Sequence, residues 1–186
     1  AGPQAAEPRG GGHTKRGEGD PRWGGSAERE ACLAQYRRLK ATMRRLEGEH
    51  RFHNLAPRAR LGPSDAAARR HVFKFRAGGE LQPGVRALSA AVDALLAGQL
   101  EAMVGLSVAV HRGLLPERYV EAALSDEVLV RVPAIPQGAA FLSGCVYSRQ
   151  FHHRLQPLME GPEARAWRGR VEEGLVARAR GGAFEA

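Results

Sequence analysis

Apolar side chains recur at three- and four-residue spacing in several stretches of this chain, which is the pattern of helices with one buried face. The first stretch, residues 28–46, has glutamates in its first turn and arginines in its last, as helix dipoles favour. Similar patterns predict helices over 95–110 and 163–178. A short helix over 116–124 begins with a proline, whose missing N–H would have no intrahelical partner at that position.

Alternating apolar and polar side chains predict strands between these helices. In the segment 69–76, the side chains of His71, Phe73 and Phe75 are expected to share one face. The segment 85–92 fits a strand or a helix equally well. Further strands are predicted over 128–132 and 141–147. The order of elements predicts an α+β fold, with an antiparallel sheet covered on one face by helices.

The 186 residues are 43% hydrophobic, which is enough for one folded domain. Residues 1–25 contain eight Gly and three Pro and few large apolar residues, so we expect a flexible arm or an insertion there. We assign the folded domain to residues 26–150 and a helical extension to residues 151–186. No apolar run approaches the ~18 residues that a membrane-spanning helix needs, so no membrane segment is predicted.

The cysteines and histidines form no recognisable metal or disulfide pattern. Cys32 and Cys145 are the only cysteines, which favours a reducing compartment, and Cys145 is expected to be buried in its strand. His50 and His53 form an HxxH, and a His-His pair follows at 152–153. Zinc needs three or four convergent ligands, so we predict no metal site and interpret these residues as loop histidines.

The net charge of +8 is unevenly distributed. Residues 1–76 hold 17 basic and 8 acidic side chains, whereas residues 77–186 hold 11 and 12. A basic part beside a neutral part indicates a polyanion as partner, most simply nucleic acid. A GC-rich coding bias would also explain part of the excess of Arg over Lys. Six basic residues surround the first predicted strand, and we predict that they contact RNA phosphates: Arg58, Arg60, Arg69, Arg70, Lys74 and Arg76.

Three segments together resemble one known family. The first is LEGEHRFHNL at 46–55, directly after a predicted helix. The second is QLEAMVG at 99–105, followed by a Leu-Pro-Glu that opens the next helix. The third is the predicted strand region at 136–147. In order and spacing, they resemble the C-terminal half of the tRNA pseudouridine synthase A family over residues 28–150.

The resemblance implies a pseudouridine synthase-like half-domain, a tRNA or rRNA partner and an isomerisation that uses no cofactor. In the family, an Asp in an Arg-Thr-Asp motif attacks the uridine, whose base must first leave its stack. This chain contains only Thr14 and Thr42, neither of them in such a motif, so we assign no catalytic residue. The family is typically dimeric, so a homodimer or a heterodimer with a related synthase is expected.

Four positions depart from the family pattern where the family builds its pocket. The family's Arg on the central helix, which is expected to pair with the catalytic Asp, corresponds here to Glu101. A Glu at that position would repel the Asp and raise its pKa. The family's His three residues earlier corresponds to Gly98, and its closing Gly-Leu corresponds to Ala139 and Ala140. We interpret these four positions as a degenerate pocket.

Three functions remain open from the sequence. The first is an RNA-binding, non-catalytic scaffold or assembly factor of a ribosome or another ribonucleoprotein. The second is an active tRNA or rRNA pseudouridine synthase whose catalytic N-terminal half is absent from this chain. The third is an interaction module for an acidic protein. We expect an intracellular location, either mitochondrial or nuclear and cytoplasmic.

Overall fold

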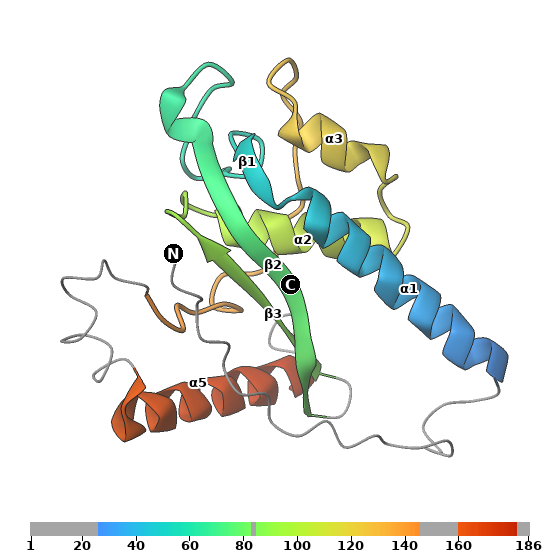
Figure 1. Ribbon diagram of the computed structural model, residues 1–186, viewed down its shortest axis with the longest axis vertical. Helices are drawn as coiled ribbons and strands as arrows, with labels where there is room; N and C mark the ends of the chain where they lie inside the picture. Colours follow the sequence, from blue (N-terminus) through green and yellow to red (C-terminus); the bar gives the residue numbers. More distant parts are fainter. Residues whose placement is uncertain (1–25, 83–84, 146–159, 182–186) are drawn as a thin grey trace, which may run out of the picture. The chain divides into compact units, whose positions relative to one another are not determined.

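The computed structural model describes residues 26–82, 85–145 and 160–181 (Figure 1). The chain falls into two compact units, Ala1–Gln35 and Tyr36–Ala186, and the described part of the first is the beginning of one helix. The elements, in chain order, are α1 (Ser26–Arg45), β1 (Gly48–Arg51), the 3-10 turn η1 (Ala66–Ala68), β2 (Arg69–Gln82), β3 (Val85–Val92), α2 (Gln99–His111), α3 (Arg118–Leu124) and α5 (Pro162–Arg180).

The three strands form an antiparallel sheet in the order β1-β2-β3. α2 crosses one face of this sheet (Figure 1). Its Met103 and Leu106 share a buried cluster with Val72 and Phe75 of β2. The predicted α+β fold with helices on one face of an antiparallel sheet is therefore confirmed.

All four predicted helices are present within about four residues of their expected ends. The main difference is at α2, which begins at Gln99 and not near residue 95, because Gly98 at its N-cap has a left-handed φ of 82°. The ambiguous segment 85–92 is a strand. The four-residue strand β1 was not predicted, since its sequence GEHR is short and polar.

β2 contains an irregularity that overturns the expected alternation of side chains. Val72 pairs with Val92 but Lys74 pairs with Ala91, so β2 has one extra residue at this point, which is a β-bulge. Val72 and Phe75 are therefore both buried, at 0% and 1% exposure, although they are three residues apart. Phe73, predicted to share a face with Phe75, instead lies 57% exposed on the opposite face.

The strands predicted over 128–132 and 141–147 are absent from residues 128–145, and residues 146–147 lie outside the described part. The physical reason is that the backbone here finds partners other than a neighbouring strand. The N–H of Val130 donates to the Asn54 side chain, and the carbonyl of Arg131 accepts from the Tyr119 hydroxyl. Cys145, predicted to be buried in the second strand, is exposed.

The irregular segment passes very close to α2 at Gly105. The N–H of Ile135 donates to the carbonyl of Glu101 on α2, with N and O 3.1 Å apart. A Cβ added at Gly105 would lie only 2.2 Å from the carbonyl oxygen of Pro133. Only glycine allows two backbones to approach this closely, so Gly105 fixes where the segment crosses the helix.

Candidate nucleic-acid interface

The sequence predicted that six basic residues contact RNA. In the structure, some of these residues are paired with carboxylates and others are not. Three of the six form ion pairs with glutamates. Arg58 pairs with Glu101 of α2 at 2.5 Å, and Arg69 pairs with Glu49 of β1 at 2.9 Å. Arg76 pairs with Glu47, which directly precedes β1. A phosphate approaching any of these three arginines would have to compete with a carboxylate for the same guanidinium.

Glu47 shows how firmly one of these pairs is built into the sheet. Its Oε1 accepts a hydrogen bond from the backbone N–H of Phe75 at 2.6 Å as well as one from Arg76. The side chain of Glu47 is only 19% exposed. A half-buried carboxylate with two donors is a structural anchor, so Arg76 is committed to the fold more than to a ligand.

The other three basic residues differ in how freely they can bind a ligand. Arg70 directs one Nη1 to the carbonyl of Arg69 at 2.7 Å, and its Nε is buried. Lys74 and Arg60 are exposed and have no acidic partner among the described residues. Arg60 has a left-handed φ of 52°, a conformation that is uncommon for a residue with a side chain. Lys74 and Arg60 are therefore the members of the predicted set whose charge is available to a phosphate.

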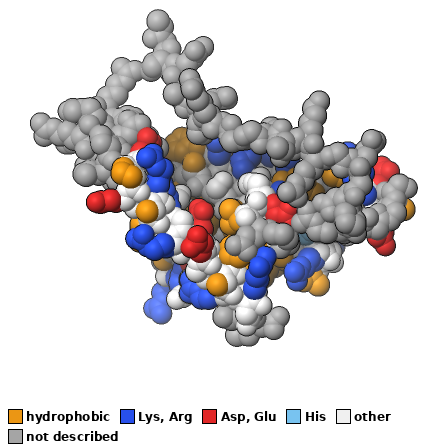
Figure 2. Space-filling view, turned by 90° about the horizontal axis from the view of Figure 1, so that it is seen from below, with side chains coloured by type: hydrophobic (Ala, Val, Ile, Leu, Met, Phe, Trp, Pro, Cys, Tyr) orange, Lys and Arg blue, Asp and Glu red, His pale blue; other side chains and the backbone are white. Residues whose placement is uncertain are grey.

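One face of the molecule shows a similar mixture of charges among the described residues. On the face drawn in Figure 2, lysine and arginine side chains form several separate groups with carboxylates between them. The basic side chains of the described residues that are visible on this face therefore form no single continuous patch.

The predicted pocket positions Gly98 and Glu101 do lie together, and Arg58 joins them. A Cβ added at Gly98 would lie 3.0 Å from Nε of Arg58 and 3.4 Å from Cδ of Pro57. The missing side chain at Gly98 thus leaves room for the Arg58 guanidinium, and Glu101 in the first turn of α2 supplies its counter-charge. We call Gly98, Glu101 and Arg58 the arginine seat.

The other two pocket positions lie in a turn. Ala139 donates its N–H to the carbonyl of Pro136 at 3.3 Å, directly after Gly138, whose φ is 83°. Arg178 of α5 donates to the carbonyl of Gly138 at 3.4 Å. The structure therefore places Ala139 and Ala140 beside α5, in a turn and not in the predicted closing strand.

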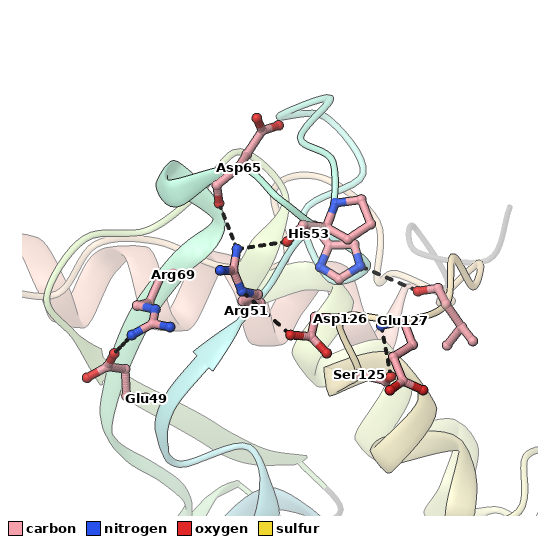
Figure 3. A network of polar contacts seen from close by, with 10 residues as sticks. Glu49, Arg51, His53, Asp65, Arg69, Ser125, Asp126 and Glu127 are labelled. Atoms are coloured by element: carbon pink, nitrogen blue, oxygen red, sulfur yellow. Dashed lines mark hydrogen bonds and ion pairs between the residues drawn. The ribbon is translucent and has the colours of Figure 1, made fainter.

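A polar network joins the loop after β1 to the turn after α3 (Figure 3). Arg51 donates to the carbonyl of Pro63 at 2.8 Å and lies 4.0 Å from the carboxylate of Asp126. The Nε2 atom of His53 hydrogen bonds to the carbonyl of Val128 at 3.4 Å. These contacts hold the loop that carries Arg58 and Arg60 against the rest of the second unit.

Asn54 is a central residue of this loop that the charge-based reading of the sequence missed. It is buried, donates to the carbonyls of Val128 and Ala123, and accepts from the N–H of Val130. An open pocket of ≈ 500 Å³ adjoins it, lined by His53, Asn54, Pro57 and residues 129–132. Its place in the LEGEHRFHNL stretch was the only available signal, and that stretch turns out to be packed and hydrogen bonded.

His50 from the same stretch has an altered acidity. Burial lowers the pKa of the His50 imidazole below 6.5, and repulsion from the charge on His71 lowers it further. Because a carbonyl can only accept, the neutral ring donates from Nε2 to the carbonyl of Glu47 at 2.8 Å. His50 also packs edge-to-face on Phe52, which is fully buried. The histidine thus lies in strand β1 and not in a loop as predicted, and its contacts there are structural.

The described residues were also considered as metal ligands and as membrane-spanning helices. Within residues 26–82, 85–145 and 160–181, no group of three or more His, Cys, Asp or Glu side chains could hold a metal ion. The predicted loop histidines at 152–153 lie outside this part. Among the helices of the described residues, none is long and apolar enough to cross a membrane.

The chain matches no family model and no curated protein.

Proposed function

We propose that this protein is a pseudouridine synthase-like RNA-binding protein that does not itself isomerise uridine and acts as a scaffold or assembly factor in a ribonucleoprotein. The observation that carries the proposal is the arginine seat. Where the resembling family carries a His and an Arg on its central helix, this chain has Gly98 and Glu101. The two departures are complementary, because one gives the Arg58 side chain room and the other neutralises its charge.

A Glu101 carboxylate that is paired with Arg58 is suited neither to act as a nucleophile nor to activate a catalytic Asp. The Glu101 side chain is 21% exposed and lies 2.5 Å from the Arg58 guanidinium, so its carboxylate already has a partner. An aspartate brought near it would be repelled, and its ionised form would be disfavoured. The 186 residues also contain no Arg-Thr-Asp motif.

RNA binding is supported by the charge distribution and by the side chains that remain available. The first 76 residues carry an excess of nine positive charges. Lys74 on the outer face of β2 and Arg60 in the loop have no carboxylate partner among the described residues. Arginine and lysine in such positions bind RNA through phosphates, which gives an affinity that falls with salt and depends little on sequence.

The test measures RNA binding and uridine isomerisation with the same protein. The full chain, in excess over a tRNA transcript, is assayed for pseudouridine by mass spectrometry and for binding by filter retention. We expect binding and no isomerisation, for the wild type and for Glu101→Arg alike. Robust isomerisation by the wild type would overturn the non-catalytic assignment. Absence of RNA binding at low salt would overturn the RNA partner and favour an acidic protein instead.

A further inference from the structure

The bulge in β2 produces a surface feature that the charge pattern does not explain. Phe73 is the extra residue of the bulge and is 57% exposed, although large aromatic side chains are ordinarily well covered. Its neighbours in the chain, Val72 and Lys74, point in different directions: Val72 is fully buried and Lys74 is exposed. Phe73 and Lys74 therefore share the outer face of the sheet, the one that α2 does not cover.

A second ring extends the exposed aromatic surface. The imidazole of His71 lies 4.5 Å from the ring of Phe73, centroid to centroid, with 37° between the two planes. His71 and Phe73 are two residues apart on one strand and occupy the same face. The side chain of His71 is partly covered, and that of Phe73 presents its free surface to solvent. The imidazole of His71 thus packs against the ring of Phe73 and supports its orientation.

The charge beside these rings identifies the kind of ligand. Lys74 follows Phe73 directly and has no carboxylate partner among the described residues. On the same strand, Arg69 and Arg76 are neutralised by glutamates, and Arg70 is turned to the carbonyl of Arg69 with its Nε buried. Lys74 is therefore the exposed charge beside the aromatic pair. A flat aromatic surface with one free cation at its side matches a nucleotide, which offers a base to stack and a phosphate to bind.

The geometry points to a stacking platform for an unpaired nucleotide, in which the base lies on Phe73, His71 supports that ring and Lys74 binds the adjacent phosphate. This inference rests on the proposed RNA-binding function and adds a specific preference for single-stranded segments. A duplex keeps its bases stacked within the helix, so only a loop, a bulge or an end of an RNA could use the platform.

The test compares a short poly(U) RNA with a duplex RNA of the same length, using fluorescence anisotropy with the full chain. Phe73→Leu keeps an apolar side chain and removes the ring, and we expect it to weaken poly(U) binding about five- to a hundredfold. The same variant should leave duplex binding within about twofold. Phe73→Tyr retains the ring and should bind poly(U) like the wild type. Leu81→Ala is the matched control, because Leu81 is an exposed apolar residue of the same strand.

Each remaining outcome decides a different point. If the wild type binds both RNAs and Phe73→Leu changes neither affinity, the platform is overturned while RNA binding stands. If poly(U) and duplex binding fall equally, Phe73 has no stacking role and the platform is likewise overturned. If the wild type binds neither RNA at low salt, the proposed function fails and the platform fails with it. Thermal melting of each variant shows whether a lost affinity reflects lost folding.

Discussion

The irregular segment that contains Pro133 passes very close to Gly105 of α2. This contact predicts whether Gly105→Ala raises or lowers the free energy of unfolding. Gly105→Ala would place a methyl group 2.2 Å from the carbonyl oxygen of Pro133, 2.7 Å from its carbonyl carbon and 2.8 Å from Cα of Ala134. Ordinary contacts of this kind begin near 3.4 Å, so the backbone would have to move by about 1 Å. All three contacts are with backbone atoms, which cannot rotate away as the end of a side chain can.

Two effects of opposite sign determine the result. Alanine has a higher helix propensity than glycine by about 1 kcal/mol, which favours the folded state. Forcing extra volume into a tight contact costs about 1–3 kcal/mol. The displacement would also stretch the hydrogen bond from Ile135 to Glu101, which contributes about 0.5–1.5 kcal/mol. We therefore expect Gly105→Ala to lower the free energy of unfolding by about 0.5–3.5 kcal/mol.

Gly174→Ala is the matched control, because Gly174 lies inside α5 with nothing within 4 Å of the added methyl group. Propensity alone acts there, so this variant should be more stable by about 0.5–1 kcal/mol. Both variants can be measured by urea denaturation followed by circular dichroism at 222 nm, the wavelength ordinarily used for helix. In a domain of this size, 1 kcal/mol corresponds to about 2–4 °C in Tm. If Gly105→Ala were as stabilising as Gly174→Ala, the segment would not cross α2 at this point.

Three further predictions concern β1, the loop that follows it and the arginine seat. Asn54→Ala should lower the free energy of unfolding by about 1–3 kcal/mol in urea denaturation, because the part-buried N–H of Val130 loses its acceptor and the carbonyls of Ala123 and Val128 lose a donor. An effect below about 0.5 kcal/mol would contradict a structural role for Asn54. Gly98→Ala should lower the Tm, because an alanine at φ 82° costs about 1–2 kcal/mol and its methyl group crowds Arg58. Adding Arg58→Ala should relieve part of that loss. If the losses of the two substitutions were fully additive, the arginine seat would be contradicted. The low pKa of His50 means that the unfolded chain binds the proton more tightly than the folded chain, so the stability that the neutral ring contributes is complete above pH 6.5 and is lost as the pH falls below it. Urea denaturation across this pH range should show a smaller loss in His50→Gln than in the wild type, and identical pH profiles would refute the assignment.

The helices could be predicted from the sequence because each carries a long, regular signal. In α1, Leu39 and Met43 repeat at helical spacing and are buried, as the stripe required. In the α5 segment, Trp167, Val171 and Leu175 repeat at helical spacing, and the helix extends over Pro162–Arg180. Signals of this kind depend only on residues close together in the chain, so no knowledge of the tertiary structure is needed to find them.

The strands were harder to predict because their outcome depends on distant partners. The segment 128–132 alternates like a strand, yet Asn54, more than seventy residues earlier, takes up its hydrogen bonds. The bulge at Phe73 is defined by the pairing of β2 with β3, and the local sequence of β2 does not predict it. Strand propensity is decided by such contacts more than by the backbone itself.

The candidate interface was predictable as a region but not as a set of contacts. Four of the six basic side chains lie on β2 and the other two, Arg58 and Arg60, lie in the loop after β1. Three of the six are neutralised by glutamates that come from other elements. The resemblance had predicted Gly98 and Glu101 as departures from the family pattern. It could not show that Arg58 fills the space that Gly98 leaves, since this requires the fold of the loop.

Salt dependence of RNA binding tests the central claim most directly. The dissociation constant of the full chain for a tRNA transcript is measured over a series of KCl concentrations, for the wild type and for Lys74→Ala. We predict that affinity falls linearly with salt on logarithmic axes, and that Lys74→Ala reduces the slope by about one, as expected for the loss of one phosphate contact. No binding at low salt, or an affinity that salt leaves unchanged, would contradict the account of this chain as an RNA-binding protein.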